Sequence, residues 1–229
     1  MVDLSRFPRP NVAVDVAVLS VVPRTREATD RALAVLALER REEPAGLALP
    51  GRFMRPGERA ADTLSTALRE KADVDLAGRE PELIGVFDAD ERDPRGWTVS
   101  LGHAVVLPTT TTSGRWVPVD ELPRLLFDHT ALVRDAVART RARYELRPDP
   151  DGLMTQAFTL AELRQLHEAV LGASLQRDTF RRRMEPLLVP HVDDGVHTSR
   201  SSGGRPARLW TVAPTDALPE RVRLPRTRR

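Results

Sequence analysis

The apolar run VAVDVAVLSVV at Val12–Val22 limits the possible folds of this chain more than any other segment. It is short, has few polar residues and is rich in β-branched valine, which predicts a buried strand. Ala34–Leu38 repeats the pattern, and Leu83–Phe87 and Thr98–Leu107 predict two further strands. Between the two strand pairs lies Arg59–Ala72, where apolar residues recur at helical spacing without a proline or glycine. The N-terminal part therefore predicts an α/β fold in which a helix covers a sheet.

The composition excludes several classes of protein. With 229 residues, 41% of them hydrophobic, the chain can bury a core, and its length fits one domain of about 150 residues plus a smaller one. It contains no cysteine, which removes disulfides, thiolate metal sites and cysteine nucleophiles. No apolar run approaches the ~18 residues that span a bilayer, and the N-terminus lacks the hydrophobic centre of a signal peptide. We therefore expect a cytoplasmic protein with no membrane partner.

Two further features divide the chain into domains. His129–Tyr144 has one apolar and one arginine-rich face, which predicts an amphipathic helix. It is followed by RPDPDG at Arg147–Gly152, where two prolines and a glycine among charged residues are typical of a linker. We therefore predict a first domain at 1–148, a second domain at 153–213 and a flexible tail at 214–229.

The second predicted domain opens with two helices. In FTLAELRQLHEAVLG, Thr159 and Glu162 have the spacing of a capping box, and Gly172 ends the helix. A short turn leads to a second predicted helix, Arg177–Leu188, with an apolar inner face and arginines outside. Two helices joined by a short turn, the second one basic, are typical of a helix-turn-helix that places its second helix in the major groove of DNA.

A basic wing is expected to follow the second helix. Leu188–Val189 and Leu209–Val212 are short apolar stretches around the polar loop SRSSGGRPAR, which predicts a two-stranded wing. The formal net charge is only +2, but the excess of basic residues lies after residue 150. We therefore predict DNA binding. The alternatives are that the arginines form a solvated helix face, or that the C-terminal domain binds protein. The candidate DNA-contacting residues are Arg177, Thr179, Arg181, Arg182, Arg183, Arg200 and Arg205.

The stretch LPGRFMRPGERAADTLSTALREKADVDL at Leu49–Leu76 resembles the Nudix box. In that family the box is a loop followed by a helix, whose glutamates hold divalent metal ions for hydrolysis of a nucleoside diphosphate linked to another group. Carboxylates at i, i+3 and i+4 lie on one helix face, so they converge on the ions. In a gapless alignment, Glu58 takes the place of the first glutamate of the box and Leu68 that of its apolar position.

The departures from the box affect its chemistry. Of the three converging carboxylates only Glu70 survives, because Ala67 and Lys71 stand at the other two positions. Arg52 and Thr66 replace the first glycine and the arginine of the box. A lone carboxylate beside an ammonium should bind Mg²⁺ poorly, so we predict that hydrolysis is lost, with no catalytic residue, metal or cofactor. The alternative is a Nudix hydrolase with relocated metal ligands, drawn from Asp73, Glu91 and Asp93.

Two other segments carry a narrower resemblance. RWVPVDELPRLLFDHTALV at Arg115–Val133 looks like a passage of Nudix-related regulators. The Thr-Phe-Arg-Arg core at Thr179–Arg182, with Gly-Arg-Pro-Ala at Gly204–Ala207 before an aromatic strand, resembles the C-terminal winged domain of the NrtR family of transcriptional regulators. This resemblance implies a Nudix α/β/α sandwich with a mixed sheet, followed by a small winged helix-turn-helix domain.

The resemblance also implies a function. A member of this family would be a DNA-binding transcriptional regulator, a repressor of NAD metabolism genes, acting as a homodimer on double-stranded operator DNA. Its effector would be an ADP-ribose-like or NAD-related metabolite bound in an inactive Nudix domain. We expect Arg52 and Arg55 to bind the diphosphate and Glu70 to make a polar contact. Some related regulators control sugar catabolism, which is the alternative.

Overall fold

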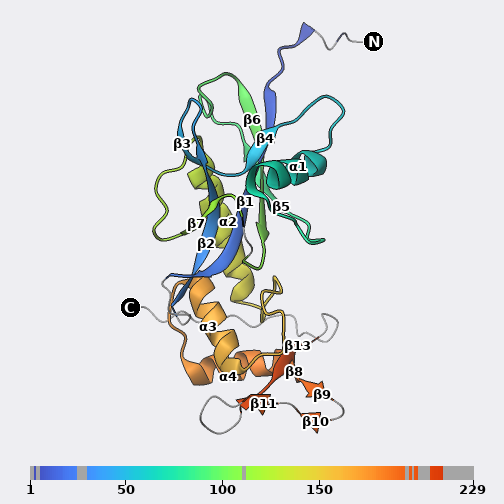
Figure 1. Cartoon of the computed structure of the whole chain (residues 1–229), viewed down its shortest axis with the longest axis vertical. Coiled ribbons are helices and arrows are strands. Elements are labelled where there is room, and N and C mark those ends of the chain that lie inside the picture. The colour runs from blue at the N-terminus through green and yellow to red at the C-terminus, as the bar shows by residue number, and fades with distance from the viewer. Residues whose placement is uncertain are drawn as a thin grey trace. The chain divides into compact units, whose positions relative to one another are not determined.

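The computed structural model divides the chain into two compact units (Figure 1). The first unit comprises Met1–Ser20 and Ala34–Val137, and the second Val21–Leu33 and Ala138–Arg229. The predicted domain limits at 148 and 153 stay a prediction. The predicted tail at 214–229 and Arg205 lie outside the described residues. The structure describes residues 3, 6–24, 30–109, 112–193, 196–197, 199–200 and 207–213.

The N-terminal part of the chain forms a mixed sheet. Its strands are β1 (Asn11–Pro23), β2 (Arg31–Arg40), β3 (Gly46–Ala48), β4 (Gly51–Phe53), β5 (Glu82–Phe87), β6 (Thr98–Val106) and β7 (Arg115–Pro118). Their order is β3-β2-β1-β6-β5, with β4 paired to β1 and β7 paired to β2. β1 and β6 are parallel, whereas β4 with β1, β3 with β2, β7 with β2, and β5 with β6 form antiparallel pairs. The four strands predicted from the sequence are confirmed as β1, β2, β5 and β6.

The three short strands β3, β4 and β7 are not predicted from the sequence. Each contains only three or four residues, including Gly46, Gly51 or Pro118. So short a stretch shows no period, and glycine or proline lowers its strand propensity. Pairing with the long strands β1 and β2 stabilises these segments instead.

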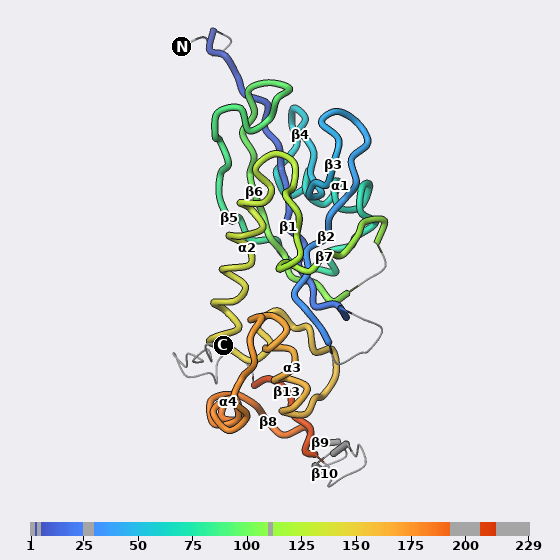
Figure 2. The backbone as a smooth tube through the Cα atoms, turned by 90° about the vertical axis from the view of Figure 1, so that its left-hand side faces the viewer, coloured from blue at the N-terminus to red at the C-terminus, as the bar shows by residue number. Residues whose placement is uncertain are grey.

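Helices cover both faces of the sheet. The two predicted helices are confirmed as α1 (Ala60–Ala72) and α2 (His129–Tyr144). Leu68 of α1 belongs to a core cluster against which Leu101 of β6 packs. At the next residue, Gly102, a Cβ atom would come within 2.7 Å of Leu132 on α2. Because neighbouring residues of a strand face opposite sides, α1 and α2 lie on opposite faces of the sheet (Figure 2). The predicted α/β/α arrangement of layers is confirmed.

The end of α1 is closed by a residue in the left-handed conformation. Asp73, which a gapless alignment places at the last glycine of the Nudix box, has a left-handed φ of 54°, and its N–H donates to the carbonyl of Leu68. Aspartate is among the few non-glycine residues that adopt this conformation readily. The departure from glycine at this position is therefore compatible with the fold.

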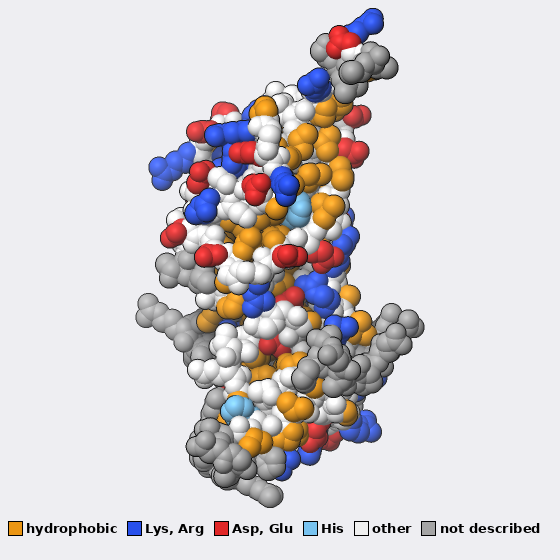
Figure 3. Space-filling view, turned by 90° about the vertical axis from the view of Figure 1, so that its right-hand side faces the viewer, with side chains coloured by type: hydrophobic (Ala, Val, Ile, Leu, Met, Phe, Trp, Pro, Cys, Tyr) orange, Lys and Arg blue, Asp and Glu red, His pale blue; other side chains and the backbone are white. Residues whose placement is uncertain are grey.

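The surface mixes charged and apolar side chains (Figure 3). The exposed large apolar residues include Leu83, Val86 and Trp97 of the first unit. Single exposed apolar residues are ordinary in a folded protein. Over the part of the chain that the structure describes, no helix is long and apolar enough to cross a membrane.

The second unit contains the predicted pair of helices, α3 (Leu160–Leu171) and α4 (Arg177–Met184). The capping box before α3 is confirmed. Thr159 Oγ1 accepts a hydrogen bond from the Glu162 N–H at 3.2 Å, and Glu162 Oε2 accepts one from the Thr159 N–H at 2.7 Å. Gly172 ends the helix with a left-handed φ of 67°. The sequence therefore fixes both ends of α3 locally.

The second predicted helix, Arg177–Leu188, is wrong at its C-terminal end. α4 ends at Met184, and a 3₁₀ turn follows at Glu185–Leu187. Pro186 causes the change, because it donates no N–H and disfavours a helical conformation of the residue before it. The inward positions are nevertheless confirmed, since Leu187 and Leu188 are buried.

The predicted wing is confirmed by an antiparallel pair of strands. β8 (Leu188–Pro190) pairs with β13 (Trp210–Val212), with Leu188 opposite Val212. Two shorter antiparallel pairs lie between them in the sequence, and we refer to all six strands as the wing. The shorter pairs are β9 (Val192–Asp193) with β10 (Val196–His197), and β11 (Ser199–Arg200) with β12 (Ala207–Arg208).

The predicted linker Arg147–Gly152 is a turn held by one buried carboxylate. Asp149 is 7% exposed and has a φ of 40°. Its side chain accepts hydrogen bonds from the N–H groups of Leu153 at 2.7 Å and Met154 at 2.8 Å. These bonds satisfy two backbone N–H groups in the segment that leads to α3.

A histidine lies in the core of the second unit. His167 of α3 is fully buried, and its ring centroid is 5.1 Å from those of Tyr144 and Phe180, both in edge contact. Burial lowers the pKa of His167 to about 3, against the backbone of Tyr144, which acts to raise it. The ring is therefore neutral at neutral pH and packs as an aromatic core residue.

Candidate functional sites

A cavity of about 890 Å³ lies in the first unit, lined by residues of β1, β4, α1 and the start of α2. Small-molecule sites span roughly 300–1,000 Å³, so the cavity has a suitable size. Arg52, Arg55 and Glu70, the three predicted ligand-binding residues, all line it; their contact with a ligand stays a prediction. The basic lining residues are Arg40, Arg41, Arg52, Arg55, Lys71, Arg92 and Arg95, and the acidic ones are Asp15, Glu39, Glu42, Glu70 and Asp93.

Glu58 organises the loop that carries the two predicted arginines. Its carboxylate accepts hydrogen bonds from Arg52 Nη2 at 3.2 Å, the Arg55 N–H at 2.9 Å and Thr63 Oγ1 at 3.0 Å. The bond from the Arg55 N–H is the main cause that lowers the pKa of Glu58 below its ordinary value. The residue at the first glutamate of the box thus holds this loop in place.

A buried carboxylate, Asp15 of β1, lies at the cavity and is absent from the predicted site. Its Oδ2 atom accepts a hydrogen bond from Ser100 Oγ at 2.6 Å and lies 3.4 Å from His129 Nε2 and 3.6 Å from Arg92 Nη2. Burial acts to raise its pKa, but His129, Ser100 and Arg92 together hold that pKa below the ordinary value. Asp15 is therefore a fixed negative charge beside the ligand space.

Two further contacts orient this network. The Leu49 N–H donates to His129 Nδ1 at 2.9 Å, so a neutral ring carries its proton on Nε2, which faces Asp15. Arg92 donates two hydrogen bonds to Asp128, at 2.8 and 2.6 Å.

The sequence does hold a signal for Asp15, because it is the one acidic residue of the first predicted strand. A charge in a buried strand requires partners.

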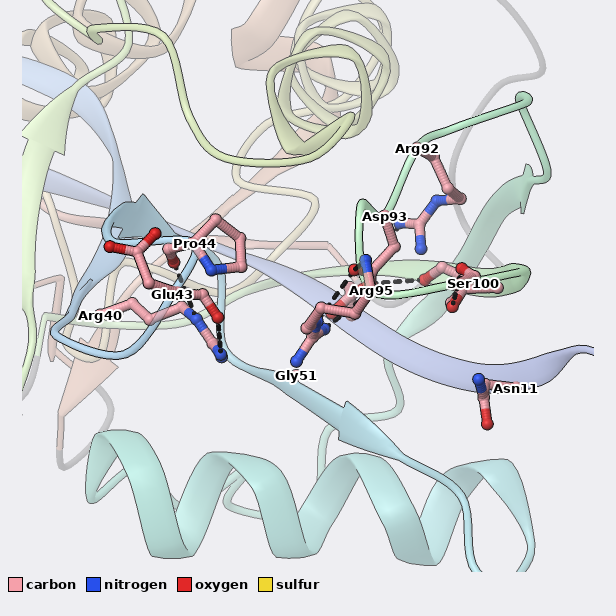
Figure 4. A network of polar contacts seen from close by, with 12 residues as sticks. Asn11, Arg40, Glu43, Pro44, Gly51, Arg92, Asp93, Arg95 and Ser100 are labelled. Carbon is pink, nitrogen blue, oxygen red and sulfur yellow. Dashed lines mark hydrogen bonds and ion pairs between the residues drawn. The ribbon is translucent and has the colours of Figure 1, made fainter.

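Arg95 links the cavity to two aromatic rings. Its guanidinium makes hydrogen bonds of 2.8 and 2.7 Å to the carboxylate of Asp93 (Figure 4). The same guanidinium lies 5.2 Å from the ring centroid of Phe53 and 5.4 Å from that of Phe127. Both rings line the cavity, and Phe53 is exposed. The cavity therefore has an aromatic side next to its cationic side.

The last turn of α1 carries Glu70 and Lys71 where the box has its two metal-binding glutamates. Lys71 Nζ donates a hydrogen bond to the Gly51 carbonyl of β4 at 2.5 Å. Among the described residues, no group of three His, Cys, Asp or Glu side chains is placed to hold a metal ion. The donors at this position do not fit the metal ions of a Nudix hydrolase.

A second concave site, of about 590 Å³, lies in the second unit between α3, α4 and the wing. We refer to it as the basic groove. The predicted DNA contacts Arg177 and Arg181 line it, together with Arg164 and Arg208. Arg208 of the wing lies over the ring of Trp210, 5.6 Å from its centroid. The structure thus brings α4 and the wing together around four arginines.

The other predicted DNA contacts differ in exposure. Arg182 is exposed, whereas Arg183 and Thr179 are half-buried. Arg200 lies in β11, where only its backbone is described, and Arg205 lies outside the described residues. Which of these side chains contact DNA stays a prediction.

The two sites define the class of protein: a Nudix-fold domain with a cavity for a small molecule, followed by a winged helix with a basic groove. Residues 152–212 match the family model described as the NrtR DNA-binding winged helix domain. The chain is 30% identical over 227 residues to the ADPR responsive transcriptional repressor NtrR of Acinetobacter baylyi, and the match covers 93% of this chain and 86% of that relative. The chain therefore belongs to the NrtR family.

Solved structures of Shewanella oneidensis NrtR resemble this chain over most of its length. One crystal structure of that protein has a TM-score of 0.69 and 27% identity, covering 93% of this chain and 99% of that chain. Its complex with a 27mer DNA has a TM-score of 0.66 and 27% identity, covering 90% of this chain and 95% of that chain. The predicted fold class, a Nudix-type sandwich followed by a winged helix, is confirmed.

Proposed function

We propose that this protein is a transcriptional repressor whose winged helix binds operator DNA and whose Nudix-fold cavity binds ADP-ribose or a related NAD-pathway metabolite. The observation that carries the proposal is the presence of a cationic cavity and a basic groove in one chain of the NrtR family. For the metabolite to control DNA binding, it must bind the DNA-free and DNA-bound states with different affinities.

The cavity suits a nucleoside diphosphate at both of its ends. On the cationic side, Arg52 and Arg55 are held by Glu58 and offer N–H donors to phosphate oxygens. On the aromatic side, Phe53 and Phe127 offer apolar surface for a base or ribose ring. A sugar phosphate would use only the cationic side. Tighter binding of nucleotides than of sugar phosphates would therefore favour NAD metabolism over sugar catabolism as the regulated process.

The basic groove supports DNA binding by α4 and the wing. In a winged helix the second helix of the pair enters the major groove, and wing residues reach the backbone. The exposure of Arg182 supports the first role for this residue, and the exposure of Arg208 on β12 supports the second. A palindromic operator would require two winged domains, so we also propose a homodimer.

We propose that the Nudix domain of this chain does not hydrolyse its ligand. Ala67 and Lys71 replace two of the converging carboxylates. Of the relocated ligands considered above, Asp73 and Glu91 are exposed and Asp93 is paired with Arg95. Incubation of the pure protein with ADP-ribose and Mg²⁺ or Mn²⁺ tests this proposal, and steady release of AMP would contradict it.

The central experiment measures binding of the full-length protein to DNA from upstream of its own gene, by fluorescence anisotropy over a range of salt concentrations. We expect a specific complex whose affinity falls steeply with salt and changes when ADP-ribose is added. The absence of a specific complex at low salt would contradict a DNA-binding role. Thermal-shift measurements with NAD, ADP-ribose, nicotinamide mononucleotide and sugar phosphates would then rank the effectors.

A further inference from the structure

The metal site implied by the Nudix box is replaced here by a different donor set. Glu70 is the one carboxylate of the converging three that remains, and the next residue, Lys71, carries an ammonium. An ammonium donates hydrogen bonds and cannot coordinate a metal ion. Lys71 Nζ is already bonded to a carbonyl, that of Gly51, 2.5 Å away.

The carbonyl that holds Lys71 has a fixed position relative to Asp15. Gly51 lies opposite Asp15 in the antiparallel pairing of β4 with β1. The strands approach so closely that a Cβ atom on Gly51 would lie 1.9 Å from Asp15 Oδ1. The bond to Gly51 therefore directs the ammonium to the cavity instead of leaving it free on the helix surface.

The surroundings of Lys71 are mostly cationic. Partial desolvation at the cavity is the main cause that lowers the pKa of Lys71, although its side chain is largely exposed, and the charges of Arg40, Arg52 and Arg95 lower it further, against Asp15, which raises it. Asp15 itself is occupied by the buried network, and no ion pair of Lys71 with a carboxylate is found among the described residues. A cation among cations attracts an anion into the space between them.

We infer that the Lys71 ammonium takes the place of a divalent cation in this cavity and binds a phosphate oxygen of the ligand directly. Lysine is a compact point charge that suits phosphate. Ligand binding then requires no metal ion. This inference rests on the proposed function, in so far as the ligand is a nucleoside diphosphate.

The experiment is calorimetric titration of the full-length protein with ADP-ribose and, separately, with inorganic pyrophosphate, each in EDTA and again in Mg²⁺. We expect the Kd of the unmodified protein for ADP-ribose to be the same in both buffers within about twofold. In EDTA, Lys71→Ala should weaken binding by roughly 10- to 100-fold, the effect of losing one charged hydrogen bond. Lys71→Arg should keep most of the affinity.

Two further variants serve as a matched control and as a test of restored metal binding. Arg69→Ala removes one exposed positive charge from the same helix outside the cavity, so its Kd should not change. Lys71→Glu restores the second metal-binding carboxylate beside Glu70, so its binding should be lost in EDTA and partly recovered with Mg²⁺. Lys71 is exposed, and circular dichroism should show native folding of each variant.

Three outcomes would separate this inference from the proposed function. If the unmodified protein binds ADP-ribose only with Mg²⁺, or if Lys71→Ala and Lys71→Glu bind normally in EDTA, the inference is wrong and the repressor proposal stands. If pyrophosphate binds through Lys71 but ADP-ribose does not bind, the ligand is wrong and the role of Lys71 stands. If neither anion binds in EDTA, the inference is overturned as well as the proposed ligand.

Discussion

The Nε2 atom of His129 lies 3.4 Å from Oδ2 of Asp15, and both side chains are buried. His129 begins α2 and Asp15 lies in β1, so this contact ties a helix to the sheet at the cavity. The same carboxylate also binds Ser100 and approaches Arg92. The stability of the cavity thus depends on one buried negative charge.

Replacing Asp15 with asparagine should destabilise the protein by about 2–4 kcal/mol, because it leaves buried partners without their charge. The pKa of Asp15 lies below its ordinary value of 3.8. Its contribution is therefore present above pH 3.8 and is lost as the pH falls through the lower folded pKa. Urea unfolding of both proteins should show a difference at pH 7 that shrinks below pH 4; a constant difference would contradict the account.

His167→Phe should remove a pH dependence of stability. The pKa of His167 falls from 6.5 to about 3 on folding, so the unfolded chain binds the extra proton between these values. Stability then decreases as the pH falls through this window, by up to about 1.4 kcal/mol per pH unit. Phenylalanine can keep the contacts with Tyr144 and Phe180. Between pH 7, 5.5 and 4.5 the free energy of unfolding should fall less steeply for the variant than for the unmodified protein. Equal slopes for the two proteins would show that His167 is not the source.

Arg182→Ala and Arg208→Ala should weaken DNA binding in different ways. We expect Arg182→Ala to reduce specific affinity by roughly tenfold or more, as for a helix residue that reaches a base. Arg208→Ala should weaken binding to all sequences and reduce the salt slope by about 1, as for a phosphate contact. Anisotropy with specific and scrambled DNA distinguishes the two, with Arg69→Ala as the control. Equal losses on both DNAs for Arg182→Ala would exclude base readout.

The triple replacement of Arg181, Arg182 and Arg183 by alanine should abolish operator binding and leave ADP-ribose binding intact. The residues lie on α4, in the second unit, whereas the cavity belongs to the first. Anisotropy and calorimetry on the same sample provide both readouts. Unchanged DNA affinity would remove α4 from the DNA-binding surface.

Thr159→Ala should lower the free energy of unfolding by about 1 kcal/mol, because it removes the hydroxyl of the capping box. Thr159→Ser keeps the oxygen that accepts the Glu162 N–H and should retain most of the stability. Urea unfolding measures both variants. A loss as large in the serine variant would point to the methyl group rather than to the cap.

The sequence predicts the elements that are long or have local signals. β1 shows a continuous apolar run and α1 shows helical spacing, each over ten or more residues, and Thr159 and Gly172 bound α3 by short-range bonds alone. The end of α4 was predictable in principle, because Pro186 is visible in the sequence. The three short strands were not, since their partners and not their own residues stabilise them.

The candidate site also has one part that the sequence predicts and one part that it does not. Arg52, Arg55 and Glu70 belong to one contiguous motif, so their shared place in the cavity follows from the loop and helix of the box. The network around Asp15 joins residues from β1, β6 and α2, and such distant partners leave no pattern in a single sequence. The parallel pairing of β1 with β6 is what brings Ser100 to Asp15.

The bonds of Glu58 bear on how sequences of this kind are classified. A glutamate inherited from a catalytic motif here shapes a loop through the Arg55 N–H and the Thr63 hydroxyl. Such a residue has reason to persist whether or not any phosphate bond is broken. Its presence in an uncharacterised genome product therefore carries no information about hydrolysis, and the residues at the positions of Ala67 and Lys71 are the ones to inspect.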